Sequence, residues 1–501
     1  MGQEAEKGRA AAAALLGGDG TAVGGRLTWT EPKVWTGPET WTGPRAWIAF
    51  DKEVRRLQYT AYGVLRSTRV EARLCHADGR VRAAALGASR FPPPELVLIR
   101  CTDWVPAVRE RAREVLGGAV AKDPEDALPA LAPLVLRLGR REHGAWAVQQ
   151  LEAALGGRDS VFAAWWRPEQ LSTTSGPKSL TDAQRTSVVD RLHLSRDLAT
   201  RQFAARLAVA PGHGIGVREL ARRAAAEPDP LTARLWNDAA LAALAADGPD
   251  DEAVDTLLRA RIPMVRAAGV TALRRSGRAR EASRHLVDRS SLVRACARWL
   301  VKQDGGDPYA HYRALLEGPE PVSPYAVTGF AECAGRPDAP LVRGLLEHPE
   351  GAVRAAALAG LRRMNGHVED AVLIRLLDEP SASVTREASL SLLPVARRLD
   401  PDHLAERIAP ERPLHIRRAA FRLLRERGGI AGLRASVALL EDSDPGLRET
   451  ARETVSLWDW QAGLRAGEGD AAELGGLLTR SAHLFGDYQL ALLRSRLGPT
   501  S

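Results

Sequence analysis

The sequence contains few of the residues and motifs that mark catalytic chemistry. Its four cysteines are scattered, none stands in a CxxC pair, and none has a histidine at the spacing of a zinc site. The eleven histidines form no HExxH or HxH pattern, and no GxSxG segment marks a serine nucleophile. We therefore expect no metal, no cofactor and no nucleophile site, and these absences favour a protein that is not an enzyme.

Aromatic residues are also scarce, at 5% of the chain, whereas Ala, Leu and Arg are abundant. These three are strong helix formers, so the composition predicts an all-α fold. A chain of 501 residues exceeds the size of a single growing core, which favours several domains or an array of repeats. The only N-terminal apolar run, AAAAALL, is too short for a signal peptide or a membrane span, so we expect a cytoplasmic protein with no membrane partner.

The net charge is modest for the length of the chain. Lys and Arg number 70 against 62 Asp and Glu, which gives 70 − 62 = +8 and a pI near 9.6. Clustered cations would suit a polyanionic partner such as nucleic acid, because binding releases counterions from phosphates. The small excess is equally compatible with arginines that pair inside the fold, so nucleic acid stays a possible partner on this evidence.

A repeated phrase organises most of the chain. HPEGAVRAAAL (348–358) and ERPLHIRRAAF (411–421) are two of its copies, each centred on an Arg that usually follows an aliphatic residue. Most steps between neighbouring copies run from 27 to 33 residues, and the two longer steps are near two and three periods. The anchoring arginines are Arg82, Arg109, Arg201, Arg234, Arg266, Arg294, Arg354, Arg386, Arg417 and Arg448.

The residues around each anchoring Arg indicate a helical hairpin. A small residue such as Ala357 follows three positions later and a Leu such as Leu361 four positions after that, which places both on one helical stripe. Proline often precedes the Arg, at a turn or a first helical position, where its missing N–H costs nothing. Acidic residues six positions before the Arg, including Asp103, Asp288 and Asp442, are placed to cap a helix or to pair with an Arg.

Through its turn Asp, its Pro and its Val-Arg doublet followed by Ala, the phrase resembles the repeats of the HEAT-repeat family, in particular the bacterial and phycobilisome-lyase-type repeats. The resemblance covers roughly residues 70–118 and 190–460. It implies an α-α superhelix, a solenoid of about ten to thirteen hairpins whose second helices line the concave face. In such repeats the Arg pairs with acids of neighbouring turns, so the ten arginines, with the three Asp residues, are expected to form a structural ladder. The family fixes architecture and not activity.

The segment 139–181 departs most from the repeat. It contains Trp165, Trp166 and Arg167, followed by a polar stretch that ends near Lys178. A long polar loop inside a stacked array carries function more often than a short one, so these four residues are candidate binding residues. The alternative is a surface insertion or a junction between two parts of the array.

The N-terminal stretch repeats Trp every six residues, at Trp29, Trp35, Trp41 and Trp47, within TGP-rich segments that cannot form one continuous helix. Either this leader lacks regular structure, or its last tryptophans cover the exposed end of the first hairpin. We favour docking of Trp41 and Trp47, with no regular structure before about residue 28. The sequence thus divides into a leader (1–45), N-terminal repeats (46–138), the irregular unit (139–181), the main array (182–460) and a C-terminal helical cap (461–501).

Particular features of the sequence motivate two functions, and a helper or enzyme that acts on a small molecule, as in the bilin-handling members of the family, stays open although no residue singles it out. The regular array and the absence of catalytic motifs favour a scaffold or adaptor that binds a protein or peptide partner on its concave face. The alternative is a nucleic-acid-binding protein, in its sharpest form an alkyl-base DNA glycosylase-like enzyme. The alternative rests on the high pI and on Trp-Asp neighbours at Asp103-Trp104, Trp236-Asn237-Asp238 and Trp458-Asp459-Trp460.

Overall fold

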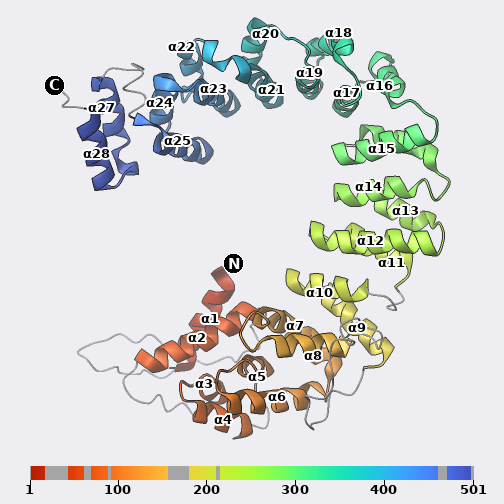
Figure 1. The fold of residues 1–501 in the computed structure, drawn as a ribbon, viewed down its shortest axis with the longest axis vertical. Helices are drawn as coiled ribbons and strands as arrows, with labels where there is room; N and C mark the ends of the chain where they lie inside the picture. The colour runs from red at the N-terminus through yellow and green to blue at the C-terminus, as the bar shows by residue number, and fades with distance from the viewer. Residues whose placement is uncertain are drawn as a thin grey trace. The chain divides into compact units, whose positions relative to one another are not determined.

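The computed structural model describes residues 2–16, 43–60, 69–88, 92–155, 180–209, 215–460 and 471–497 (Figure 1). Within these ranges the regular structure is helical throughout and includes no strand. The predicted all-α fold is therefore confirmed. None of the described helices combines the length and the hydrophobicity that a membrane span requires.

The chain forms two compact units, of which unit 1 comprises Met1–Ala272. Its helices are α1 (Gly2–Leu16), α2 (Pro44–Thr60), α3 (Val70–Leu74), α4 (Gly79–Ala88), α5 (Pro94–Arg100), α6 (Pro106–Val120), α7 (Pro124–Leu138), α8 (Ala145–Leu155), α9 (Asp182–His193), α10 (Leu198–Ala208), α11 (Val217–Ala226), α12 (Pro230–Ala246), α13 (Asp251–Leu258) and α14 (Pro263–Ala272).

Unit 2 comprises Leu273–Ser501. Its α-helices are α15 (Ser291–Gln303), α16 (Pro308–Glu317), α17 (Pro324–Ala331), α18 (Ala339–Gly344), α19 (Gly351–Arg363), α20 (Asp370–Arg375), α21 (Ala382–Leu392), α22 (Pro401–Ala405), α23 (Leu414–Arg427), α24 (Gly429–Ala438), α25 (Pro445–Leu457), α27 (Ala471–Arg480) and α28 (Asp487–Leu497). Short 3₁₀ helices join several of them: η4 (Ala279–Val287), η5 (Arg336–Asp338), η6 (Leu345–Glu347), η7 (Leu376–Asp378), η8 (Leu393–Arg398), η9 (Glu406–Ile408) and η10 (Ala482–Leu484).

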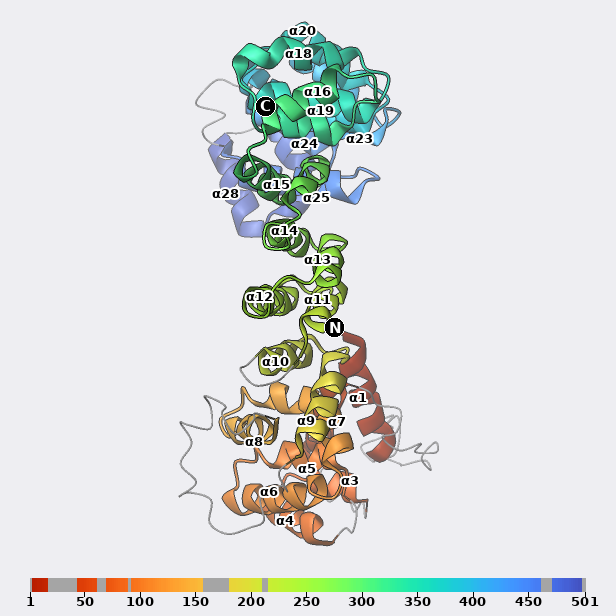
Figure 2. The same ribbon diagram turned by 90° about the vertical axis from the view of Figure 1, so that its right-hand side faces the viewer.

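In both units each hairpin packs on the next in sequence, which is the arrangement of a helical-repeat solenoid. In unit 1 the second helices α10, α12 and α14 contact one another in turn, and the first helices α11 and α13 do the same. Figure 2 shows these as two adjacent rows. In unit 2 the second helices α17, α19, α21 and α23 follow the same rule, and they lie on the inner side of the bend of that unit (Figure 1).

Local sequence explains where the second helices begin. Pro106, Pro263 and Pro445 are the first residues of α6, α14 and α25. Asp229 and Asp444 are N-caps, whose side chains accept the backbone N–H of Thr232 and Leu447. A proline has no N–H to leave unpaired at this position, and the N-cap carboxylate satisfies a donor that lacks an intrahelical partner. The recurring Asp and Pro therefore define the start of these helices.

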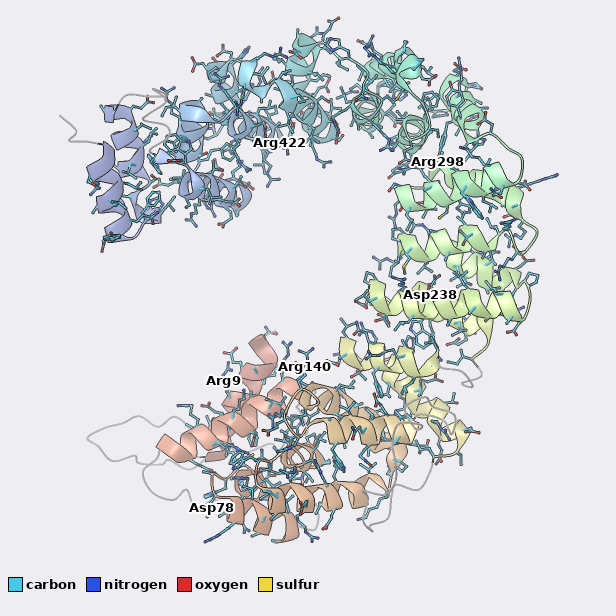
Figure 3. The ribbon with its side chains drawn as sticks, in the orientation of Figure 1. Arg9, Asp78, Arg140, Asp238, Arg298 and Arg422 are labelled. Atoms are coloured by element: carbon cyan, nitrogen blue, oxygen red, sulfur yellow. The ribbon has the colours of Figure 1, made fainter. Side chains whose placement is uncertain are left out.

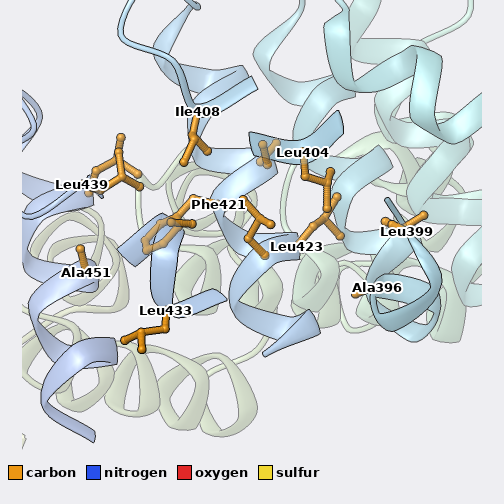
Figure 4. Close-up of a cluster of buried hydrophobic side chains, with 14 of the residues drawn as sticks. Ala396, Leu399, Leu404, Ile408, Phe421, Leu423, Leu433, Leu439 and Ala451 are labelled. Carbon is orange, nitrogen blue, oxygen red and sulfur yellow. The ribbon is translucent and has the colours of Figure 1, made fainter. Parts of the chain in front are cut away.

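The small residue three positions after the anchoring Arg lies where two helices cross. Ala85, Ala297 and Ala451 are fully or almost fully buried at this position. Gly269 shows why a larger residue fails there, because a Cβ at Gly269 would lie 2.8 Å from the backbone nitrogen of Leu258 in α13. Leu273, Leu361 and Leu424, on the same predicted stripe, are buried. Figure 4 shows how apolar side chains of this kind fill the space between α22, α23, α24 and α25.

The N-terminal leader differs from our expectation. Residues before about 28 were expected to lack regular structure, yet α1 forms over Gly2–Leu16 and packs against α2. Its alanine-rich sequence has high helix propensity, and α2 offers the apolar surface that a helix needs for stability. Trp47 is buried in α2 and meets Phe50 edge to face. Trp29, Trp35 and Trp41 lie outside the described residues.

At the other terminus, aromatic side chains join the last regular hairpin to the following helices. The Trp460 ring lies 5.1 Å from that of Trp458 and 6.2 Å from that of Phe485, both edge to face. Leu474 and Leu477 of α27 are buried in the same core. The division between the two units falls after Ala272, within the predicted main array. The five-part division of the chain inferred from the sequence remains a prediction.

Candidate functional site

Seven of the ten anchoring arginines share one geometry in the described structure. Each is the fourth residue after the N-cap of a second helix, and its Nη1 donates to the backbone carbonyl six residues earlier, at distances of 2.5–3.0 Å. That carbonyl lies in the turn that joins the two helices of the hairpin. The seven are Arg82, Arg109, Arg201, Arg266, Arg294, Arg354 and Arg448.

The remaining guanidinium nitrogens of several of these arginines reach a carboxylate of the following hairpin. Such pairs are Arg82–Asp103 at 2.8 Å, Arg201–Glu227 at 3.2 Å, Arg294–Glu332 at 2.5 Å and Arg354–Glu379 at 2.7 Å. Arg417 pairs with Asp442 in the same way, and its Nε donates to the carbonyl of Ile408. These contacts connect one repeat to the next.

The turn aspartates have two functions in these contacts. The carboxylates of Asp103, Asp288 and Asp442 each accept the backbone N–H two residues later, and their backbone carbonyls each accept an anchoring Arg. The carboxylates of Asp103 and Asp442 also accept the Arg of the preceding hairpin. One aspartate thus fixes its own turn and joins two repeats.

Arg234 and Arg386 do not occupy the fourth position after the N-cap, the position from which the seven arginines reach the turn carbonyl. Both side chains are 67% exposed, and each pairs with an acid of its own helix, Asp238 or Glu387. The reason is a shift of register by one residue, because the fourth position after the N-cap is Ala233 in α12 and Thr385 in α21. Thr385 takes the place of an Arg there, and its hydroxyl donates to the carbonyl of Glu379, six residues earlier.

The candidate binding residues of the irregular segment, Trp165, Trp166, Arg167 and Lys178, lie outside the described residues. Their role therefore remains a prediction. The preceding helix α8 ends at Leu155, and the following helix α9 begins at Asp182.

Two of the three Trp-Asp neighbours, Asp103-Trp104 and Trp236-Asn237-Asp238, do not place an accessible carboxylate beside an accessible ring. The Asp103 side chain is fully buried and receives Arg82 and Arg100. Trp236 is fully buried and Trp460 is 3% exposed. Asp238 is exposed, but it pairs with Arg234. Among the described residues, no group of three or more His, Cys, Asp or Glu side chains is placed to hold a metal ion.

A cluster of arginines lies on two second helices of unit 2 and is not part of the ladder. Arg422 of α23 is half-buried and donates to the hydroxyl of Ser389 at 2.5 Å. Burial lowers the pKa of Arg422, and the neighbouring cations Arg386 and Arg425 lower it further, whereas the nearby Glu387 carboxylate raises it; the net shift is downward. Within the described structure, neither Arg422 nor Arg425 has a carboxylate at ion-pair distance. Figure 3 shows Arg422 on the inner side of the unit.

Small side chains lie beside this cluster. On α19, Ala352, Ala356 and Ala359 follow one another at spacings of four and three residues, which places them on one stripe, and all three have solvent exposure. On α23, Arg418, Arg422 and Arg425 have the same spacing. We call the stripe on α19, the Arg386 position on α21 and the stripe on α23 the inner face of unit 2.

Comparisons with known proteins do not assign this chain to a family. No family model and no curated protein matches the chain. An engineered protein is 16% identical over 90% of this chain and 94% of its own, with a TM-score of 0.21. Kap95p, solved with RanGDP in a study of nuclear import complex assembly, is 12% identical over 89% of this chain and 62% of its own, with a TM-score of 0.27. The helical-repeat assignment therefore rests on the packing of the helices described above.

Proposed function

We propose that this helical-repeat protein is a HEAT-type adaptor of the cytoplasm, without catalytic activity, that binds an acidic segment of a protein partner on the inner face of unit 2. The observation that carries the proposal is Arg422, a half-buried guanidinium near Arg386 and Arg425 that has no carboxylate at ion-pair distance within the described structure. A half-buried cation without an ion pair is unfavourable, and a partner carboxylate would offset the cost of its desolvation and its repulsion by the other two arginines.

The neighbouring alanine stripe supports a polypeptide partner. Ala352, Ala356 and Ala359 leave a surface without long side chains on α19. A partner backbone can approach such a surface closely, while its acidic side chains reach the arginines of α21 and α23. Arg binds carboxylates with two parallel hydrogen bonds, so the cluster would also fix the orientation of the bound segment.

Nucleic acid is the alternative partner, because Arg binds phosphates with the same fork geometry and the chain has a pI near 9.6. Single-stranded nucleic acids are usually held by aromatic side chains on which bases stack. The continuous described segment 351–427 contains one aromatic side chain besides histidine, Phe421, and it is buried. This composition favours an acidic polypeptide.

A selection from a displayed library of random peptides tests the proposal and does not require an identified partner. The wild-type protein is expected to enrich sequences rich in Asp and Glu, and the variant Arg386→Gln/Arg422→Gln/Arg425→Gln is expected to lose that enrichment. The matched control Arg284→Gln/Arg336→Gln/Arg480→Gln removes the same charge from exposed positions elsewhere in unit 2 and should select like the wild type. Equal enrichment by both variants would contradict the proposal.

A further inference from the structure

A small pocket in unit 1 contains an unusual concentration of charge. It has a volume of about 200 Å³ and lies between α2, α5, the turn that follows α5 and Arg141, which follows α7. Four cations line it, Lys52, Arg55, Arg100 and Arg141, against two carboxylates, Asp51 and Asp103. The lining therefore has an excess of 4 − 2 = two positive charges.

The two carboxylates are already engaged. Asp51 accepts Arg100 and, at 3.3 Å, Arg55. Asp103 accepts Arg82 at 2.8 Å and Arg100 at 3.3 Å. Both carboxylates are buried and their direct ion pairs are with Arg55, Arg82 and Arg100, so within the described structure neither forms an ion pair with Arg141 or Lys52.

Arg141 is a half-buried cation of the lining that has no ion pair among the described residues. Its Nη1 donates to the hydroxyl of Thr102 at 3.2 Å. Burial lowers the pKa of Arg141 and the nearby Arg55 lowers it further, whereas the carboxylates of Asp51 and Asp103 raise it; the net shift is downward. A half-buried cation without an ion pair carries a desolvation cost that a bound anion would offset.

Trp104 lines the pocket and contacts two arginines, of which Arg55 also belongs to the lining. Its ring lies 4.8 Å from the guanidinium carbon of Arg55 and 4.4 Å from that of Arg82. Such cation–π contacts hold a guanidinium in a fixed orientation. Trp104 itself is 60% exposed, an unusual position for the largest apolar side chain, and it stands at the surface beside the charged lining.

We propose that this pocket binds a small phosphate dianion, either inorganic phosphate or the terminal phosphate of a small monoester. The excess of positive charge in the lining suits a dianion, and a guanidinium such as that of Arg141 can donate two parallel N–H hydrogen bonds to phosphate oxygens. Pockets for larger organic ligands usually enclose about 300–1,000 Å³. The smaller volume here suits the phosphate group alone or with a short substituent. This site is in unit 1 and does not depend on the proposed adaptor surface of unit 2.

Isothermal titration of the full-length protein with inorganic phosphate, glycerol 3-phosphate and acetate tests the proposal. Both phosphates are expected to bind with a stoichiometry of one and acetate is expected to give no saturable heat. Tighter binding of glycerol 3-phosphate would identify a monoester as the natural source of the anion, and tighter binding of inorganic phosphate would identify the free ion. Absence of saturable binding of either phosphate at millimolar concentration would overturn the proposal.

Two neighbouring variants separate this role from a structural one. Arg141→Met is expected to weaken phosphate binding at least tenfold, since it removes the unpaired cation, whereas Arg140→Met changes the adjacent exposed residue and should bind like the wild type (Figure 3). In the absence of phosphate, Arg141→Met is expected to unfold at the same temperature as the wild type or at a higher one. Unchanged phosphate binding by Arg141→Met, or a clear loss of its thermal stability without phosphate, would contradict the assignment.

Discussion

Arg82 and Asp103 join two consecutive hairpins through a two-point ion pair that is removed from solvent. The Nε–Oδ2 and Nη2–Oδ1 distances are 2.9 and 2.8 Å, and both side chains are fully buried. Nη1 of Arg82 uses the carbonyls of His76 and Ala77, so each nitrogen of the guanidinium has an acceptor. A buried Arg is tolerated here because its hydrogen-bonding groups are satisfied.

Breaking this pair is expected to destabilise unit 1 strongly. Asp103→Asn would leave Arg82 and Arg100 buried beside a neutral side chain, at a cost of about 3–5 kcal/mol. The double variant Arg82→Met/Asp103→Asn is expected to be less destabilised than the sum of the two single variants, because the uncompensated charge of Arg82 is then absent. Urea unfolding of the wild type, Arg82→Met, Asp103→Asn and the double variant measures these differences. Additive losses would show that the two side chains act independently.

The shift of register at α21 makes a second prediction. Arg294→Ala should lower the free energy of unfolding by about 2–3 kcal/mol, because the Arg294 side chain is buried and bonds to Glu332 and to the carbonyl of Asp288. Arg386→Ala should change stability by less than about 0.5 kcal/mol, because its side chain is exposed. Thr385→Val should cost about 1 kcal/mol through its lost hydrogen bond. Urea unfolding of the three variants provides the comparison, and a larger loss from Arg386→Ala than from Arg294→Ala would contradict the geometry.

His193 gives a prediction for pH. Its ring lies 5.1 Å from that of the buried Trp236, and burial, followed by the nearby Arg223, lowers the pKa of His193. The unfolded chain then binds more protons than the folded chain below the ordinary histidine pKa of about 6.5, so stability is lost as the pH falls through that range. His193→Gln is expected to lose less thermal stability than the wild type between about pH 7 and about pH 5. An identical loss in both proteins would exclude His193 as a contributor.

Much of the fold was accessible from the sequence because it depends on local features. The spacing of Arg354, Ala357 and Leu361 predicted one buried stripe, and Ala357 and Leu361 are buried. Aligning the repeated phrases on their arginines instead of their N-caps placed Arg234 and Arg386 one residue away from the position that bonds to the turn. Counting four residues from Asp229 or Ser381 would have selected Ala233 and Thr385.

The candidate sites were harder to predict because they depend on contacts between distant residues. Lys52, Arg100 and Arg141 meet in one pocket only after three helices pack. Whether an arginine is paired also depends on the neighbouring hairpin, so the sequence could not separate Arg417, which pairs with Asp442, from Arg422. One signal was present, the spacing of Arg418, Arg422 and Arg425, which predicts a basic stripe on a single helix.

The seven arginines that bond to the turn carbonyl are expected to act inside the array, whereas Arg386, Arg422 and Arg425 are expected to act on a partner. Fluorescence anisotropy with a labelled oligo-glutamate peptide, duplex and single-stranded DNA, and RNA tests this expectation most directly, with wild type, Arg386→Gln/Arg422→Gln/Arg425→Gln and the charge-matched control Arg284→Gln/Arg336→Gln/Arg480→Gln. We predict that the peptide binds wild type and control alike, that its affinity falls as salt is raised, and that the first variant loses it. Binding of nucleic acid in preference to the peptide, or an equal loss of peptide affinity in both variants, would contradict the role proposed for these three arginines.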